Sequence, residues 1–181
     1  MLLISGLHAS RFVGEQQGRN CPAAKIAGKI DMLKGLDPLL SADLLGLLDA
    51  MGHGDDLVIA DRNFPAHSVS LHTTSRRLIS ERGVDTNQMA KAILSVFPLD
   101  TYVDIQIHHM QVIGAPDTIL SVHSELLAIA QAGEKAPVKM AAIERMAFYE
   151  AAKRAYMVVQ TGETRPFGCF ILKKGVIPAG T

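Results

Sequence analysis

The feature of this sequence that most restricts its fold is a short apolar run, Leu57-Val58-Ile59-Ala60, which has polar residues on both sides. A strand with one face in water alternates apolar and polar side chains, whereas a continuous run suits a strand that is covered on both faces. Strands of that kind occur in sheets with helices on each side, so the run predicts an α/β protein.

Helical and strand patterns alternate around this run. Ser41 suits the N-cap of a helix whose leucines recur at helical spacing, and Gly52 ends that helix. Further helices are predicted from Asp85 or Thr86 to Phe97, over residues 117–131 and over 145–155, and further strands at Val103, Ile105 and Ile107, over 156–159 and over 169–172. No segment repeats, so the pattern predicts one layered α/β/α domain and leaves the order of its strands open.

The first 31 residues differ from the rest of the chain. They hold four basic and two acidic residues, whereas the other 150 residues hold 14 basic and 16 acidic ones. Residues 14–20 show neither helical nor strand periodicity, so we predict a poorly ordered N-terminal extension at 1–31 before a domain at 32–181. Met32 is an alternative start, so the extension reflects either a start assigned too far upstream or, less readily, a targeting segment.

The composition limits the partners of the chain. It has 18 Lys and Arg and 18 Asp and Glu, few aromatic residues and no tryptophan. A net charge of zero argues against nucleic acid and membranes as partners, and no apolar run approaches the roughly 20 residues that span a bilayer. Cys21 and Cys169 are too widely spaced for a metal knuckle, and so few cysteines are typical of a reducing compartment, so we expect a cytoplasmic protein.

The densest polar cluster in the sequence, residues 52–56, has His53 between two glycines. Such a histidine lies in an open turn, and imidazole groups in general titrate near neutral pH, as proton transfer requires. Asp61 follows the next predicted strand, and at a shared sheet edge the two side chains would do acid–base chemistry. Spacing alone favours the alternative, in which His53 is a solvated turn residue and Asp61 caps a helix.

The other candidate groups carry weaker signals. The remaining histidines of the domain lack the close spacing with carboxylates that metal sites show, and the adjacent His108 and His109 would face opposite sides of a strand, so no metal site is predicted. Phosphate-loop, dinucleotide and nucleophile-elbow motifs are absent from the sequence, which argues against nucleotide enzymes and serine hydrolases. Arg145 begins a predicted helix, where the helix dipole disfavours a cation, so either a salt bridge or a ligand-facing guanidinium is expected.

Seven short blocks keep a fixed order and spacing across residues 32–177. They are Met51-Gly-His53-Gly-Asp55, Ala60-Asp61-Arg-Asn-Phe64-Pro65-Ala66, Pro98-Leu-Asp-Thr-Tyr102, Ile143-Glu-Arg145, Phe148-Tyr149-Glu150, Thr161-Gly-Glu163 and Leu172-Lys-Lys-Gly175-Val176. Together these blocks resemble the L-fucose mutarotase and D-ribose pyranase family. The fucose mutarotase branch is the nearer one, because Arg145 stands where the pyranases carry a histidine.

The resemblance implies a cofactor-independent isomerase without a metal. Its substrate would be a free monosaccharide, L-fucose or a related aldose, whose anomers or ring forms it interconverts. The resemblance also implies a homo-oligomer, with decamers among the family's assemblies and with sites near subunit contacts.

The resemblance also implies roles for individual residues. His53 matches the family's catalytic proton donor, and Asp61 and Arg145 match residues that bind the sugar. A sugar-contacting segment, Tyr-Gly-Asn in fucose mutarotases, is Phe167-Gly168-Cys169 in this sequence, so a phenol hydroxyl and an amide are missing. Loss of such hydrogen-bonding groups changes substrate selectivity.

The chemistry of mutarotation fits these residues. A proton leaves the anomeric hydroxyl and one reaches the ring oxygen, so no nucleophile, metal or hydride carrier is required. On this hypothesis His53 donates to the ring oxygen, Asp61 and Arg145 hold hydroxyls, and Asp55 orients the turn. Two alternatives are a non-catalytic sugar-binding or regulatory protein of the same fold and a metal-dependent enzyme that uses the histidines.

Overall fold

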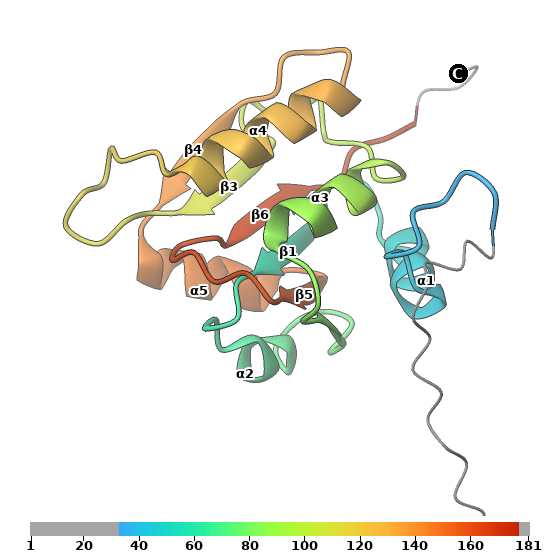
Figure 1. The fold of residues 1–181 in the computed structure, drawn as a ribbon, viewed down its shortest axis with the longest axis horizontal. Coiled ribbons are helices and arrows are strands. Elements are labelled where there is room, and N and C mark those ends of the chain that lie inside the picture. The colour runs from blue at the N-terminus through green and yellow to red at the C-terminus, as the bar shows by residue number, and fades with distance from the viewer. Residues whose placement is uncertain (1–32, 178–181) are drawn as a thin grey trace, which may run out of the picture.

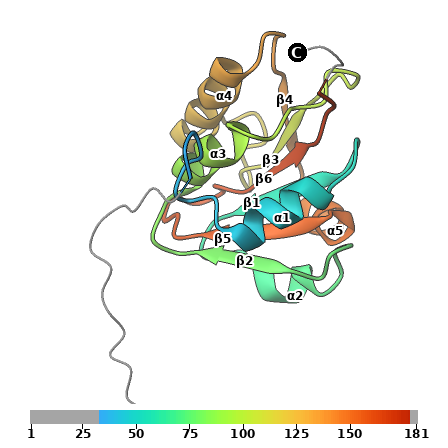
Figure 2. The ribbon, with the colours of Figure 1, turned by 90° about the vertical axis from the view of Figure 1, so that its right-hand side faces the viewer.

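A computed structural model describes residues 33–177 of the 181-residue chain. The extension predicted at 1–31 lies outside the described residues. Within them, one six-stranded sheet lies between two layers of helices (Figure 1, Figure 2), which confirms the α/β/α architecture.

The described residues form five helices and six strands. The helices are α1 (Ala42–Ala50), α2 (Ala66–Ser70), α3 (Thr86–Leu94), α4 (Ser121–Gly133) and α5 (Arg145–Arg154). The strands are β1 (Asp56–Ala60), β2 (Leu78–Glu81), β3 (Ile107–Met110), β4 (Met140–Ile143), β5 (Met157–Thr161) and β6 (Phe170–Lys173). In the sheet order β2-β5-β1-β6-β3-β4, β6 alone runs antiparallel to its neighbours, so the other five strands end at one common edge.

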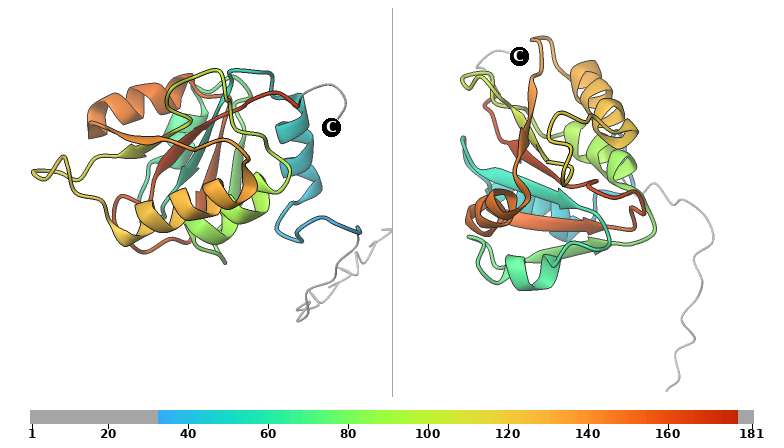
Figure 3. Two further views of the ribbon diagram at one scale, coloured as in Figure 1. Left: turned by 90° about the horizontal axis from the view of Figure 1, so that it is seen from above. Right: turned by 90° about the vertical axis from the view of Figure 1, so that its left-hand side faces the viewer.

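Strand β1 is covered on both faces, as its apolar run predicts. Leu57 and Ile59 pack in the core formed with α1, α3 and α4. Val58 and Ala60 pack in the second core, formed with α2 and α5. Figure 3 (left) shows the strands lying between α5 and the neighbouring helices α3 and α4.

Local capping signals confirm two of the helix starts. The Oγ atom of Ser41 accepts the N–H of Leu44 at the start of α1. At the start of α3, Asp85 and Gln88 form a reciprocal capping box. The C-terminal end of α1 is closed by a distant residue, since Nζ of Lys174 donates to the carbonyls of Leu48 in the last turn and of the C-cap residue Met51.

Three predicted boundaries differ from the structure. Helix α3 ends at Leu94, short of Phe97. Strand β3 begins at Ile107 rather than Val103, because the side chain of Gln106 bonds the Val103 carbonyl and the Lys139 N–H and so holds a turn before the strand. Helix α4 begins at Ser121 rather than at residue 117, after a loop in which Gly114 has a positive φ of 74°.

Three short elements were not predicted by the sequence patterns. Helix α2 has five residues, which is too few for a helical period to be visible. Strands β2 and β4 form the two edges of the sheet, and in the four residues of each only Ile79 is buried. Their apolar alternation is therefore weak.

Two buried histidines make the fold sensitive to acid. Burial and the neighbouring His123 lower the pKa of His109 from 6.5 to about 4. As the pH falls below 6.5, His109 takes up a proton in the unfolded chain but not in the folded chain. The contribution of neutral His109 to the free energy of unfolding is therefore fully present above pH 6.5 and is lost as the pH falls toward 4. We expect the free energy of unfolding to decrease by about 2–3 kcal/mol across this window.

Urea denaturation between pH 7.5 and 4.5 measures this decrease. In His109→Leu the decrease should be smaller, because the unfolded chain no longer gains that proton. An equal decrease of the free energy of unfolding with falling pH in the two proteins would contradict the assignment to His109.

Candidate active site

The common edge at which the parallel strands end carries a pocket of about 190 Å³. Ligands of open α/β sheets bind at this edge. The pocket is lined by Asp61, Asn63, Phe64, Met110, Ile113, Arg145, Tyr149, Pro166, Phe167 and Cys169. We call it the sheet-edge pocket; it brings together four of the residues that the resemblance connects with sugar binding: Asp61, Arg145, Phe167 and Cys169.

Asp61 is fixed by the turn that follows β1. Its side chain is buried, and its Oδ1 atom accepts the N–H groups of Asn63 at 2.9 Å and Phe64 at 3.0 Å. Helix α2 begins only at Ala66, after Pro65, so Asp61 holds a turn and the alternative that it caps a helix is wrong. The Asp61 side chain lines the pocket beside the side chain of Cys169.

Arg145 is an exposed pocket residue at the first position of α5. The preceding residue, Glu144, caps the helix by accepting the N–H groups of Met146 and Ala147, and its negative charge offsets the unfavourable position of the guanidinium. No described residue forms a salt bridge or hydrogen bond with the guanidinium of Arg145. Of the two explanations for a cation at this position, the structure favours a guanidinium that faces a ligand.

The segment Phe167-Gly168-Cys169, called the 167–169 segment below, contributes Phe167 and Cys169 to the lining of the pocket. Gly168 is required there, because a Cβ atom would lie 2.8 Å from Cγ of Glu163. The Cys169 thiol is buried and lies 3.5 Å from the backbone N–H of Asp61. Burial, together with the negative charge of Asp61, raises the pKa of the Cys169 thiol well above its usual value, so the thiol stays protonated.

His53 lies at the opposite edge of the sheet. It precedes β1 whereas Asp61 follows it, so the expectation that the two share an edge is wrong. The five steps from Asp56 to Asp61 alone span roughly 16 Å at the rise of an extended strand. Within one chain, His53 therefore cannot reach a ligand in the sheet-edge pocket.

A buried carboxylate at this opposite edge orients His53. Nε2 of His53 lies 3.1 Å from Oδ2 of Asp100, and the Asp100 side chain is 2% exposed whereas that of His53 is 47% exposed. The other oxygen of Asp100 accepts the N–H of Tyr102, whose ring meets the imidazole edge-on. With its Nε2–H directed at Asp100, the ring has Nδ1 as its second nitrogen for proton exchange.

The sequence reasoning missed Asp100 as a functional residue. Its signal was present in the block Pro98-Leu-Asp-Thr-Tyr102, but nothing in the spacing connects that block to His53. Asp55, the residue expected to orient the turn, accepts the N–H of Gly52 at 2.7 Å. This is the contact expected of a residue that shapes the histidine turn.

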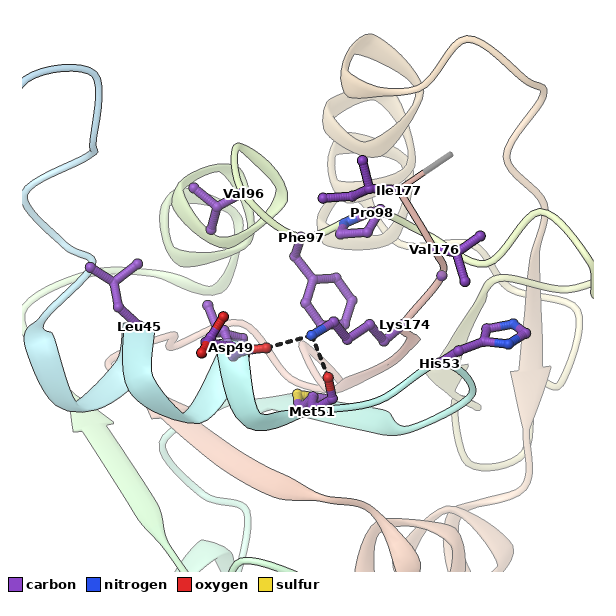
Figure 4. A pocket seen from close by; sticks show the side chains of 12 residues that line it. Leu45, Asp49, Met51, His53, Val96, Phe97, Pro98, Lys174, Val176 and Ile177 are labelled. Carbon is purple, nitrogen blue, oxygen red and sulfur yellow. Dashed lines mark hydrogen bonds between the residues drawn. The ribbon is translucent and has the colours of Figure 1, made fainter. Parts of the chain in front are cut away.

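A second, larger pocket of about 470 Å³ lies beside His53, between α1 and the segment that follows β6. Figure 4 shows Lys174 crossing it beneath apolar side chains such as Phe97 and Ile177. The Lys174 ammonium is already bonded to the carbonyls of Leu48 and Met51. This pocket offers a sugar fewer free polar groups than the sheet-edge pocket does.

Two features of the described residues bear on other functions. Among residues 33–177, no group of three or more His, Cys, Asp and Glu side chains is arranged to hold a metal ion. In the same part of the chain, every helix is too short or too polar to cross a membrane.

Comparison with known proteins assigns the family. Residues 34–177 match the model of the RbsD / FucU transport protein family. A fucose mutarotase of Danio rerio is 45% identical over 153 residues, covering 81% of this chain and 95% of the relative. An L-fucose mutarotase of Glaesserella parasuis is 43% identical over 151 residues, covering 83% of this chain and 99% of the relative.

A solved structure agrees with these sequence matches. The crystal structure of the fucose mutarotase from Streptococcus pneumoniae in complex with L-fucose superposes with a TM-score of 0.72 at 36% identity. The match covers 81% of this chain and all of the other chain. The chain therefore belongs to the RbsD/FucU family.

Proposed function

We propose that this protein is a cofactor-independent mutarotase that interconverts the anomers of L-fucose or a closely related aldose. The observation that carries the proposal is the sheet-edge pocket, in which an oriented carboxylate and an unpaired guanidinium lie among aromatic side chains. Relatives named fucose mutarotases match over nearly their whole length, and a related structure holds L-fucose.

The pocket suits a small neutral sugar. Asp61 accepts hydrogen bonds from hydroxyl groups, and Arg145 donates to them. Phe64, Tyr149 and Phe167 offer apolar surface to the C–H faces of the ring. At about 190 Å³ the pocket is smaller than the roughly 300–1,000 Å³ typical of drug-sized ligands, which favours one monosaccharide.

The reaction is a balanced proton exchange. The anomeric hydroxyl releases its proton to a solvent water, His53 donates a proton to the ring oxygen, and the bond between C1 and the ring oxygen breaks to give the open-chain aldehyde. Rotation about the C1–C2 bond and reclosure then yield the other anomer: the attacking hydroxyl returns its proton to the imidazole, and the oxygen on C1 takes a proton back from water.

Each site requires two copies of the chain, because the sheet-edge pocket and the His53–Asp100 pair lie at opposite ends of β1. In a homo-oligomer, His53 of one copy approaches the pocket of its neighbour. Both ends have exposed apolar side chains for such a contact: Tyr102 near His53 is 76% exposed, and Ile113 at the pocket is 63% exposed. Head-to-tail contacts of this kind close into rings, and the decamer expected from the resemblance is compatible with them.

The cellular location follows from the same proposal. Free aldoses are substrates of internal sugar metabolism, and Cys169 is a buried free thiol that needs no oxidising environment. The cytoplasm is therefore the proposed location.

Exchange NMR on a panel of free aldoses tests the activity. We expect the wild-type protein to accelerate anomer exchange of L-fucose and His53→Ala to lower the rate by about 10²–10⁴-fold, the usual contribution of a positioned acid or base. His67→Ala, on the exposed side of α2, is the control and should keep the wild-type rate. A wild-type protein that broadens sugar signals without accelerating exchange would instead be the non-catalytic binder.

Mixing two inactive variants tests the shared site. His53→Ala and Arg145→Ala each remove one half, and both substitutions replace exposed side chains. Random co-assembly of equal amounts pairs an intact His53 with an intact pocket at about one site in four. Roughly a quarter of the wild-type activity should therefore return when the sugar concentration is below saturation. A mixture as inactive as its components would show that each site lies within one chain.

Asp100→Asn tests the orientation of His53. The buried carboxylate does not reach the sugar, so we expect kcat to fall by about 10–10²-fold with KM nearly unchanged, because the imidazole loses its partner while sugar binding is intact. Asp104→Asn, whose side chain is 98% exposed, is the matched control. A change in KM alone would contradict a role in proton transfer.

A further inference from the structure

A buried pair of histidines lies behind the 167–169 segment and takes no part in the chemistry proposed above. His109 on β3 and His123 on α4 are 1% and 0% exposed, and their ring centroids are 4.1 Å apart. Nε2 of His123 lies 3.0 Å from the carbonyl oxygen of Phe167. A core histidine therefore contacts the backbone of the segment that lines the sheet-edge pocket.

The second ring nitrogen of His123 determines where the ring carries its proton. The backbone N–H of Leu120 donates to Nδ1 over 3.3 Å. Because a backbone N–H only donates, Nδ1 is the unprotonated nitrogen, and the proton of the neutral ring is on Nε2. Burial lowers the pKa of His123, which favours this neutral form, so Nε2–H donates to the Phe167 carbonyl.

Phe167 needs such a partner because its backbone is strained. Its φ of 60° lies in the left-handed region, which residues with a Cβ atom rarely adopt. A conformation of this kind persists only where the surrounding structure holds it. The bond from His123 acts on the peptide carbonyl of the strained residue itself.

Other elements hold the two carbonyls that follow. The Gly168 carbonyl accepts Oγ1 of Thr86 at 3.0 Å, and the Cys169 carbonyl accepts the N–H of Met110 at 3.1 Å. Thr86 begins α3 and Met110 ends β3, so both donors belong to the packed layers. His123 supplies the remaining anchor, at Phe167, the first residue of the segment.

The N–H groups of the segment explain why its conformation matters. Those of Gly168 and Cys169 donate to no other described residue, although both residues are buried. Buried donors without a partner are unfavourable, so they suit the hydroxyl oxygens of a bound sugar. The side chains contribute less, since Phe167 has no hydroxyl and the Cys169 thiol faces the backbone of Asp61.

We infer that His123 is a positioning residue of the sugar site: it holds the carbonyl of Phe167 and so aims the N–H groups of the 167–169 segment at the sugar. This inference rests on the proposed function. His123 itself is fully buried and does not touch the sugar. Its removal should therefore weaken sugar binding and leave proton transfer by the His53–Asp100 pair intact.

Two substitutions separate the bonds of His123. The amide of Asn reaches the position of Nδ1 and accepts the Leu120 N–H, whereas the longer Gln reaches the position of Nε2 and donates to Phe167. We expect His123→Asn to raise KM for L-fucose about tenfold, the usual effect of one lost hydrogen bond to a buried carbonyl, and His123→Gln to stay within about twofold of wild type. In both variants kcat should remain within about twofold of wild type.

His109→Leu is the matched control, because it removes the other ring of the pair, which forms no hydrogen bond with the 167–169 segment. It should change the melting temperature and leave KM unchanged. Equal KM values for His123→Asn and His123→Gln would overturn the inference and leave His123 a purely structural residue.

Hydrogen–deuterium exchange gives a readout that does not require activity. Peptides that cover the 167–169 segment should exchange faster in His123→Asn than in His123→Gln, and added L-fucose should protect them in wild type. Faster exchange across all of α4, with no difference at the segment, would overturn the inference. If the wild-type protein accelerates exchange of no aldose, the proposed function fails, and these protection patterns still decide the role of His123.

Discussion

The double coverage of β1 is the constraint on which the rest of the structure depends. Because both faces of this strand are apolar, helices must pack on each side, and the strand must lie inside the sheet with β5 and β6 as neighbours. The same strand then separates the polar turns at its two ends. The turn with His53 is fixed at one edge and Asp61 at the other, so the packing of one strand determines how the functional groups are divided.

The functional carboxylates share a second physical principle, in which one oxygen holds the backbone and the other is left for function. Oδ1 of Asp61 accepts the N–H two residues ahead, and Oδ1 of Asp100 does the same. Oδ2 of Asp100 meets His53, while the Asp61 side chain lines the sheet-edge pocket. Carboxylates held in this way keep their orientation without a ligand, so little ordering remains when a sugar binds.

Local signals predicted those parts of the molecule that depend on neighbouring residues. The caps at Ser41 and Asp85 and the strand around Ile59 follow from short patterns, whereas the edge strands bury too little to leave one. The residues of the pocket came from the resemblance, since composition and periodicity do not connect Asp61 with Arg145. The insertion of the antiparallel β6 beside β1, which brings Cys169 against Asp61, and the pairing of His53 with Asp100 are long-range contacts that no local pattern encodes.

A site divided between two copies links catalysis to assembly. On the proposed mechanism an isolated chain has a complete sugar pocket and a complete His53–Asp100 pair, yet it lacks activity because the two never meet. Dissociation therefore abolishes turnover without unfolding, and a sugar that bridges the two copies stabilises the assembly by mass action. The backbone donors of the 167–169 segment fit this arrangement, because main-chain groups anchored by Thr86, Met110 and His123 stay in place whether or not the neighbour is present. The pocket is thus formed by the single chain, and the neighbour supplies only the proton.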